Sequence, residues 1–297
     1  MNIENLTGLE KPIMKLFETV GEYIGVVGNH IFEFDAAKIR RIGQAEADVE
    51  KQKIISRAEG QEMAVEILGR AKKRFALEQY NKQINLENIL VKTKDDLNGK
   101  TVSEDPVEKD WTMRFLDVAQ NISREELQAI LAKILSGEIQ KPGRFSFKTL
   151  EIIKYLSKTD LEKLQKFIAL SSRDGFFRFG GVSQAEMMRK YDLDFTDFVR
   201  LSDLGLFNQS LHLSVSFDIK CNMPAMTNIG KEIFAISLEK GAKKLDISCS
   251  LFSTAGQEIY SLLLDDAKNE KLKVYIEDFI KYIESQGCKI QKIKFKG

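Results

Sequence analysis

Large apolar residues recur at helical spacing near the start of the chain. Over residues 13–32 they lie three or four positions apart, which predicts an amphipathic helix. The apolar positions are Ile13, Leu16, Phe17, Val20, Tyr23, Ile24 and Val27. Such a helix packs inside a domain, or it lies on a partner protein or a membrane surface. We therefore treat 1–34 as an N-terminal amphipathic helix, with 9–34 as the part that would meet a membrane.

The pattern changes over residues 35–97, where charged residues dominate. Ala, Glu, Lys, Arg and Gln are all strong helix formers, and no proline occurs between positions 13 and 105. We predict one long charged helix. Its apolar residues are sparse: Ile39, Ile42, Val49, Ile54, Ala58, Val65 and Leu68. Because so narrow a seam cannot form a core alone, it needs a partner helix from this chain or from another copy. We expect 35–97 to bind a second copy or another protein in a coiled-coil-like manner.

Polar residues with Gly99 and Pro106 indicate a linker over 98–110. Dense apolar stripes at helical spacing follow and predict a helical bundle over 111–175. Two sequences of the capping-box type predict helix starts within it, Ser123 with Glu126 and Thr159 with Glu162.

The remainder, 176–297, predicts an α+β domain of winged-helix type. A capping box at Ser183 and Glu186 starts a short helix. After this helix come a second helix, two strands, a last amphipathic helix and a lysine-rich edge strand. In order, these lie at 195–204, 211–219, 244–252, 272–283 and 288–296. Segments 227–234 and 253–260 also resemble each other, and each predicts a strand-to-helix turn. The predicted fold class is thus mainly α, with a long charged helix, a small bundle and an α+β C-terminal domain.

Charge and cysteine content narrow the class of protein. The 45 basic and 44 acidic side chains leave a net charge of +1, so no global field attracts nucleic acid or anionic lipid. The cysteines, Cys221, Cys249 and Cys288, form no C-x-x-C pair and fit a reducing compartment. Neither a signal peptide nor an apolar run of about 18–20 residues is present. We expect a cytoplasmic protein, membrane-peripheral if 9–34 binds lipid.

No arrangement of residues predicts catalysis, a cofactor or a metal. The histidines, His30 and His212, have no ligand partner at helical spacing. Glu125 and Glu126 are adjacent and point to different helix faces, while helix-start electrostatics explain Glu232 and Glu258. The tripeptide at 99–101 lacks the first glycine of a phosphate loop. We therefore predict a non-enzyme without catalytic, cofactor-binding or metal-binding residues.

Nucleic-acid binding is expected to be unlikely because the second helix of the winged-helix segment has the wrong charge. Over 183–204 five acidic residues outnumber three basic ones, whereas phosphate contacts need a basic face. Protein docking is the use we expect instead. The alternative of a nucleic-acid-binding regulator would use the C-terminal lysines, Lys289, Lys292, Lys294 and Lys296.

Residues 104–157 carry the most specific pattern. Its elements are Asp110-Trp111, Phe115, Ser123, Glu125 to Gln128, Ala132 to Leu135, Gly137-Glu138, Pro142-Gly143, Phe145-Ser146 and Leu150. They resemble the signature of a bacterial family catalogued as domain of unknown function 2806. The opening Leu9 to Pro12 and the glycine turn near the C-terminus resemble it too, while Leu131 stands where the family has an aromatic residue.

Two further resemblances concern function. The arrangement is similar to the abortive-infection alpha proteins, which implies a bacterial origin and an anti-phage defence context. The charged helix resembles the coiled-coil region of stomatin, prohibitin and flotillin proteins, which implies assembly. We expect a non-enzymatic interaction and assembly protein, with a peripheral membrane factor and a nucleic-acid-binding regulator as alternatives.

Overall fold

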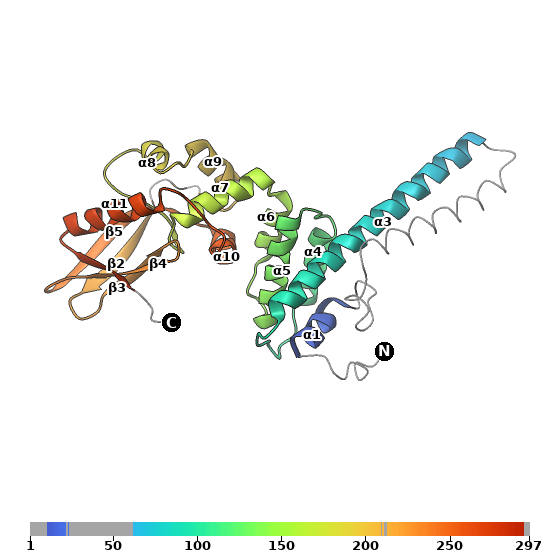
Figure 1. Cartoon of the computed structure of the whole chain (residues 1–297), viewed down its shortest axis with the longest axis horizontal. Coiled ribbons are helices and arrows are strands. Elements are labelled where there is room, and N and C mark those ends of the chain that lie inside the picture. Colours follow the sequence, from blue (N-terminus) through green and yellow to red (C-terminus); the bar gives the residue numbers. More distant parts are fainter. Residues whose placement is uncertain (1–10, 22, 24–61, 209, 211–212, 294–297) are drawn as a thin grey trace. The chain divides into compact units, whose positions relative to one another are not determined.

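A computed structural model of the chain describes residues 11–21, 23, 62–208, 210 and 213–293. The chain divides into two compact units, Met1–Phe147 and Lys148–Gly297. The described residues are mainly α, with ten α-helices, one π-helical turn and six strands (Figure 1). None of the described helices has both the length and the apolar character that crossing a bilayer requires.

The first unit is helical throughout its regular structure. Its elements are α1 (Lys11–Leu16), the π-helical turn η2 (Phe17–Gly21), α3 (Glu62–Leu97), α4 (Lys109–Ala119) and α5 (Glu125–Gln140). The long helix expected over 35–97 is described from residue 62 onward, while 35–61 lie outside the described residues. A loop joins α3 to α4 in the segment predicted as a linker.

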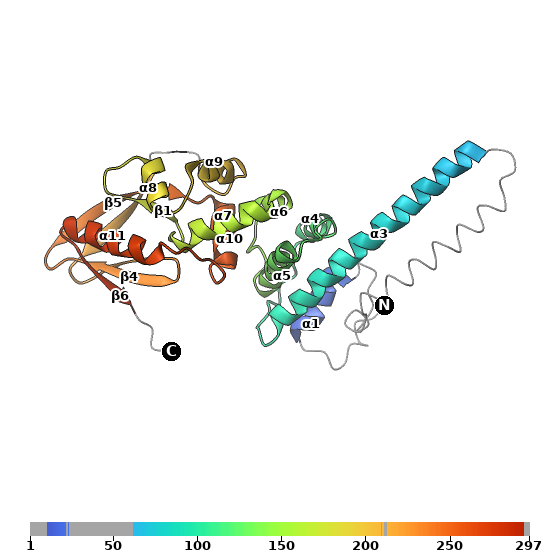
Figure 2. The ribbon, with the colours of Figure 1, turned by 45° about the horizontal axis from the view of Figure 1, so that its top comes forward.

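The core of the first unit forms where α3 lies against α5, as Figure 2 shows. Apolar residues of α5 at helical spacing are fully buried, among them Leu131, Ile134 and Leu135. From α3, Ile89 and Leu97 enter the same unit's core. The predicted capping box at the start of α5 is wrong, because Arg124 occupies the N-cap, its side chain makes no capping hydrogen bond, and Ser123 lies outside the helix.

The second unit combines helices with two small antiparallel sheets. Its helices are α6 (Phe147–Tyr155, which starts at the last residue of the first unit), α7 (Lys158–Ala169), α8 (Gln184–Lys190), α9 (Phe195–Asp203), α10 (Thr254–Leu263) and α11 (Leu272–Ser285). The division at 147/148 therefore falls inside the span 111–175 in which we expected one bundle. The box that starts α7 is Ser157 with Asp160, two residues before the predicted one.

The strands form two three-stranded sheets. They are β1 (Gly175–Arg178), β2 (Ser214–Lys220), β3 (Ala225–Ile229), β4 (Glu232–Ser237), β5 (Ala242–Leu251) and β6 (Lys289–Ile293). One sheet has the order β1-β5-β2 and the other β3-β4-β6. The predicted strands at 211–219 and 244–252 are confirmed as β2 and β5, and the lysine-rich edge strand is confirmed as β6, which pairs with β4.

The two similar segments fold differently. Ser253 caps α10 as predicted, because its side chain accepts a hydrogen bond from Gly256 N. The earlier segment is not a strand-to-helix turn but the β3–β4 hairpin, in which Gly230 takes a positive φ of 54°. Pairing with β6 on its far side holds β4 in the sheet, so tertiary context overrides the local pattern.

Candidate interaction surfaces

The signature residues of 104–157 build a fixed loop at the end of α5. Trp111 donates its indole N–H to the Phe145 carbonyl at 2.8 Å. The buried carboxylate of Glu138 accepts the backbone N–H groups of Gly143 and Phe145 at 2.5 and 3.0 Å. Glu138 is the one buried acid of the signature, and its hydrogen bonds hold the loop. They explain the signature as a structural pattern, with no catalytic role for this acid.

Gly137 is fixed by the same packing. A Cβ at this position would lie 2.7 Å from the Phe145 ring, a distance that close-packed side chains do not tolerate. The glycine and the aromatic residue eight positions later therefore belong to one structural unit.

The other acids singled out from sequence are exposed or half-buried. Glu125 is exposed and forms an ion pair with Lys92 at 3.1 Å, and Glu126 is exposed one position further along α5. Glu258 in α10 accepts a hydrogen bond from Thr149. Glu232 begins β4, where it forms an ion pair with Lys292. The expectation that Glu232 lies at a helix start is wrong, because its segment is a hairpin.

Neither histidine lies among the described residues. Cys221 is exposed, whereas Cys249 and Cys288 are buried, and burial raises the pKa of the Cys249 thiol well above its usual range. Within the described part of the chain, no group of three or more His, Cys, Asp or Glu side chains is placed to hold a metal ion.

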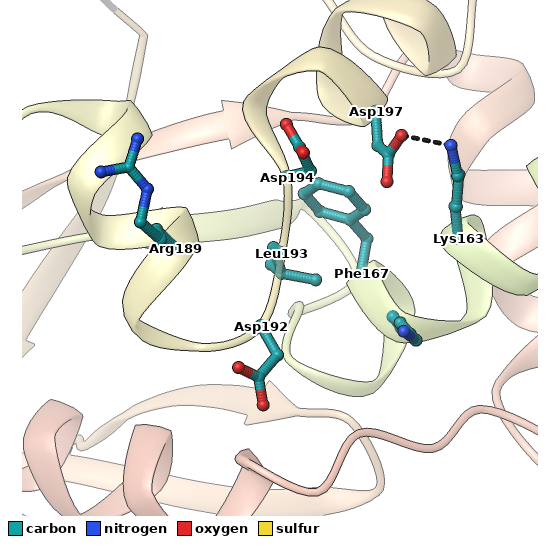
Figure 3. Close-up of a pocket in the computed structure, with 8 residues that line it drawn as sticks. Lys163, Phe167, Arg189, Asp192, Leu193, Asp194 and Asp197 are labelled. Carbon is teal, nitrogen blue, oxygen red and sulfur yellow. Dashed lines mark hydrogen bonds and ion pairs between the residues drawn. The ribbon is translucent and has the colours of Figure 1, made fainter.

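A groove of about 350 Å³ lies in the second unit beside the turn that joins α8 to α9 (Figure 3). Buried Phe167 and Leu193 line it together with charged residues of both signs. These are Lys163, Lys166, Arg189, Asp192, Asp194 and Asp197. Three cations balance three anions, so the groove presents no net charge to a ligand.

Several of these charges already have partners. Lys163 forms an ion pair with Asp197, drawn as the dashed line in Figure 3. Asp194 caps α9 by accepting the backbone and hydroxyl groups of Thr196, both at 2.8 Å, and these bonds lower the pKa of its carboxyl. The groove is thus a mixed polar surface above an apolar floor, and its charges do not favour a polyanion.

The turn itself has an unusual backbone. Asp192 has a φ of 57° and is the one non-glycine residue with positive φ in the described part of the chain. Aspartate tolerates this left-handed region better than most residues. It lets the chain reverse between α8 and α9 within the short link 191–194, as in the helix-turn-helix arrangement.

The outward face of α9 is short of cations. Its exposed positions are Thr196, Val199, Arg200 and Asp203. Arg200 binds the buried Asp160 through two nitrogens, which keeps the pKa of that carboxyl far below its usual range. The one cation on this face therefore ties α9 to α7 and is already engaged.

The clearest uncovered apolar surface lies on the first half of α3. The side chains of Ile67, Leu68 and Phe75 are 52%, 55% and 63% exposed. Together with Ala71 they lie at positions that follow helical spacing and share one side of the helix. We call these four residues the α3 stripe.

The apolar residues of 13–32 are used differently where the structure describes them. Leu16, Phe17 and Val20 are buried, and α1 packs on α3 and α5. At the other end of the chain, Lys289 and Lys292 of β6 form ion pairs with Glu239 and Glu232. Lys294 and Lys296 lie outside the described residues.

Comparison with known proteins adds a family but no relative of known activity. No curated protein and no solved structure matches the chain. One family, described as "Protein of unknown function (DUF2806)", matches residues 69–277. The matched segment runs from within α3 into α11 and includes the Trp111–Glu138–Phe145 loop. Since it covers well over half of the chain, the protein belongs to the DUF2806 family.

Proposed function

We propose that this protein is a non-enzymatic interaction and assembly protein whose docking element is α3. The single observation that carries the proposal is the α3 stripe, in which Phe75 is 63% exposed. Apolar surface removed from water stabilises an association by roughly 25 cal/mol per Å². A contiguous stripe at helical spacing suits a partner helix better than isolated contacts do.

The second unit would supply another docking module. We propose that it is a winged helix enlarged by the β3–β4 hairpin. Helices α7, α8 and α9 accompany the β1-β5-β2 sheet, and α8 and α9 meet at the turn containing Asp192. The charge-balanced groove and the shortage of cations on the outward face of α9 favour a protein ligand over DNA.

The biological setting is also a proposal. The likeness to abortive-infection alpha proteins favours a bacterial defence role, in which assembly would respond to phage infection. Plaque counts on cells that express the wild-type chain or Leu68→Glu/Phe75→Glu test it. Protection by wild type alone supports the role, while equal plaque counts in both strains and in cells without the gene would reject it.

Two alternatives receive less support. A peripheral membrane factor would use 9–34, but Leu16, Phe17 and Val20 of that segment are buried within the first unit. A nucleic-acid-binding regulator would use the C-terminal lysines, of which Lys289 and Lys292 have acidic partners. Both remain predictions, testable by vesicle co-sedimentation and by salt-sensitive retention of DNA or RNA.

Light scattering on the purified full-length chain tests the main proposal. We expect a dimer or larger assembly at micromolar concentration and a shift to monomer in Leu68→Glu/Phe75→Glu. Met223→Glu is the matched control, because Met223 is similarly exposed, at 58%, in the second unit. A wild-type chain that stays monomeric throughout the micromolar range would overturn the proposal.

A further inference from the structure

Two turns of the second unit meet at one end of its sheets, at the left of Figure 1. One turn follows β2, and the other joins β4 to β5. Cys221 of the first turn donates its backbone N–H to the Gly241 carbonyl of the second at 3.0 Å, which ties the two turns together. We call residues 220–226 and 238–244 the β-tip.

Two methionines give the β-tip an apolar surface. Met223 and Met226 are 58% and 53% exposed, and Pro224 between them is exposed as well. Single exposed apolar residues are common, but apolar residues that gather at one place mark a surface that meets a partner or a membrane.

The strands place the β-tip away from the neighbouring segments of the chain. β2 runs from Ser214 toward the β-tip. β6 begins at Lys289, opposite Ser237, and ends at Ile293, opposite Ile233. The chain therefore enters β2 and leaves β6 at strand ends that are remote from the two methionines.

Free lysines surround this apolar surface. Lys220, Lys240 and Lys244 are exposed, and within the described part of the chain their side chains form no ion pair or hydrogen bond. Lys220 forms a β-bridge with Met223 and pairs with Ala242. Because residues opposite each other in an antiparallel pair share a face, and alternate residues of a strand do too, Met223, Lys220 and Lys244 all point outward from the same face.

The other charges of the β-tip already have partners. Glu239 forms an ion pair with Lys289 at 2.6 Å, which lowers the pKa of the Glu239 carboxyl. Lys243 donates to the Gln286 carbonyl. Asp218 lies opposite Lys244, one step further from the turns, and limits the cationic surface on that side. The free charge of the β-tip is therefore positive.

This combination fits the surface of an anionic bilayer better than other partners. Two adjoining turns form a projecting end, whereas peptides are recognised by grooves and sheet edges. Nucleic-acid phosphates would attract the lysines but would gain nothing from exposed methionines. At an anionic bilayer, lysines meet the headgroups while apolar side chains enter the boundary with the acyl chains.

We propose that the β-tip binds the surface of an anionic lipid bilayer, with Met223 and Met226 inserted among the headgroups. This inference goes beyond the proposed function, because it concerns the second unit and does not depend on α3. The net charge of +1 gives the whole chain no attractive field. The attraction comes from the local lysines and acts over about 8–10 Å at physiological salt.

Co-sedimentation of the full-length chain with vesicles tests the role of charge. We expect the chain to pellet with vesicles of phosphatidylcholine and phosphatidylserine, less so as salt is added, and far less with phosphatidylcholine alone. The variant Lys220→Glu/Lys240→Glu/Lys244→Glu should bind the anionic vesicles at least about tenfold more weakly.

A matched control separates the β-tip from net charge. Lys158→Glu/Lys268→Glu/Lys273→Glu alters the charge of the chain by the same amount, at three exposed lysines elsewhere in the second unit. It should retain most of the binding. A wild-type chain that does not pellet with anionic vesicles, or an equal loss of binding in the two triple variants, would overturn the inference.

The native Cys221 reports on insertion. It is exposed, whereas Cys249 and Cys288 are buried, so a thiol-reactive dye sensitive to its surroundings labels the β-tip of an otherwise unchanged chain. We expect its emission to shift to the blue with anionic vesicles. Met223→Ser/Met226→Ser should reduce this shift and weaken binding about tenfold. A labelled chain that pellets without any shift binds through another surface, which would show the inference to be wrong.

Two further measurements separate this inference from other readings. Lysine-dependent retention of DNA, without pelleting by anionic vesicles, would identify nucleic acid as the ligand of the β-tip and reject the bilayer. Light scattering in the absence of lipid measures assembly independently, so failure of the vesicle experiments leaves the proposed function standing.

Discussion

The two halves of α3 have similar composition but opposite surroundings. In the second half, Ile89, Leu90 and Leu97 are buried beneath elements of the first unit. In the first half, Leu68 and Phe75 are more than half exposed. Leu68, Phe75 and Ile89 even follow the same column of the helix, because they are separated by multiples of seven residues.

The difference shows what decides burial along a charged helix. Near its C-terminal end, large apolar residues occur every three or four positions and fit against α5, which supplies its own continuous apolar face. Further toward the N-terminus the apolar residues are flanked by cations and no described element covers them. The helix therefore extends through both halves, while the contacts that bury its large apolar residues are found in the second half.

The largest expected effect comes from a substitution in the covered half of α3. Leu97→Ala should lower the free energy of unfolding by about 2–5 kcal/mol, because it empties a fully buried site. Phe75→Ala should leave the unfolding free energy of the monomer nearly unchanged. Urea denaturation at a protein concentration too low for assembly measures both. Equal losses in the two variants would show that both halves are covered within one chain.

A second prediction concerns the helix that covers α3. Glu138→Gln should cost about 1–3 kcal/mol, because its buried carboxylate accepts two backbone N–H groups and the amide matches them poorly. Glu125→Gln on the exposed start of α5 serves as the control and should cost less than about 1 kcal/mol. If Glu138→Gln is as stable as the control, the signature acid does not hold the loop.

Asn85 lies at the transition between the two halves. Its amide donates to the Gln120 carbonyl at 2.9 Å, and its oxygen accepts from buried Gln128 at 3.4 Å. Asn85→Ala should lower stability by about 1 kcal/mol and raise hydrogen exchange in neighbouring turns of α3. Asn81→Ala, one turn earlier and exposed, should change neither quantity. Exchange that rises equally in both variants would contradict this boundary.

Sequence alone predicted helices and strands well where one face is strongly apolar. The β2, β5, β6 and α11 segments were found from such patterns. Helix starts were harder, because Ser157 and Thr159 both precede an acid by three residues and only packing selects the first. The hairpin at Gly230 was missed because its local sequence resembles that of a real helix start at 253–260. Pairing with β6, far along the chain, decides the outcome.

The candidate surfaces were only partly predictable. Of the narrow seam predicted on the charged helix, Leu68 is described and is exposed, but sequence could not say which half of α3 would be covered. The groove beside α8 and α9 was not predicted, since its lining comes from α7 and from the turn at Asp192. The sequence shows the excess of acidic residues over 183–204. It does not show the pairing of Arg200 with Asp160, because that depends on how α7 and α9 pack.

The smallest expected effect is a gain in stability, and it tests whether the first half of α3 is uncovered. Gly69 is helical, and a Cβ added there would meet no atom within 4 Å. Gly69→Ala should therefore raise the unfolding free energy by about 0.5–1 kcal/mol, because alanine loses less backbone freedom than glycine. Gly137→Ala, whose Cβ would meet the Phe145 ring, should instead lower the unfolding free energy.

Since Gly69 lies away from the α3 stripe, Gly69→Ala should leave dimerisation unaffected. Destabilisation by Gly69→Ala would mean that a neighbour covers this side of the helix too, and the contrast between its halves would then disappear.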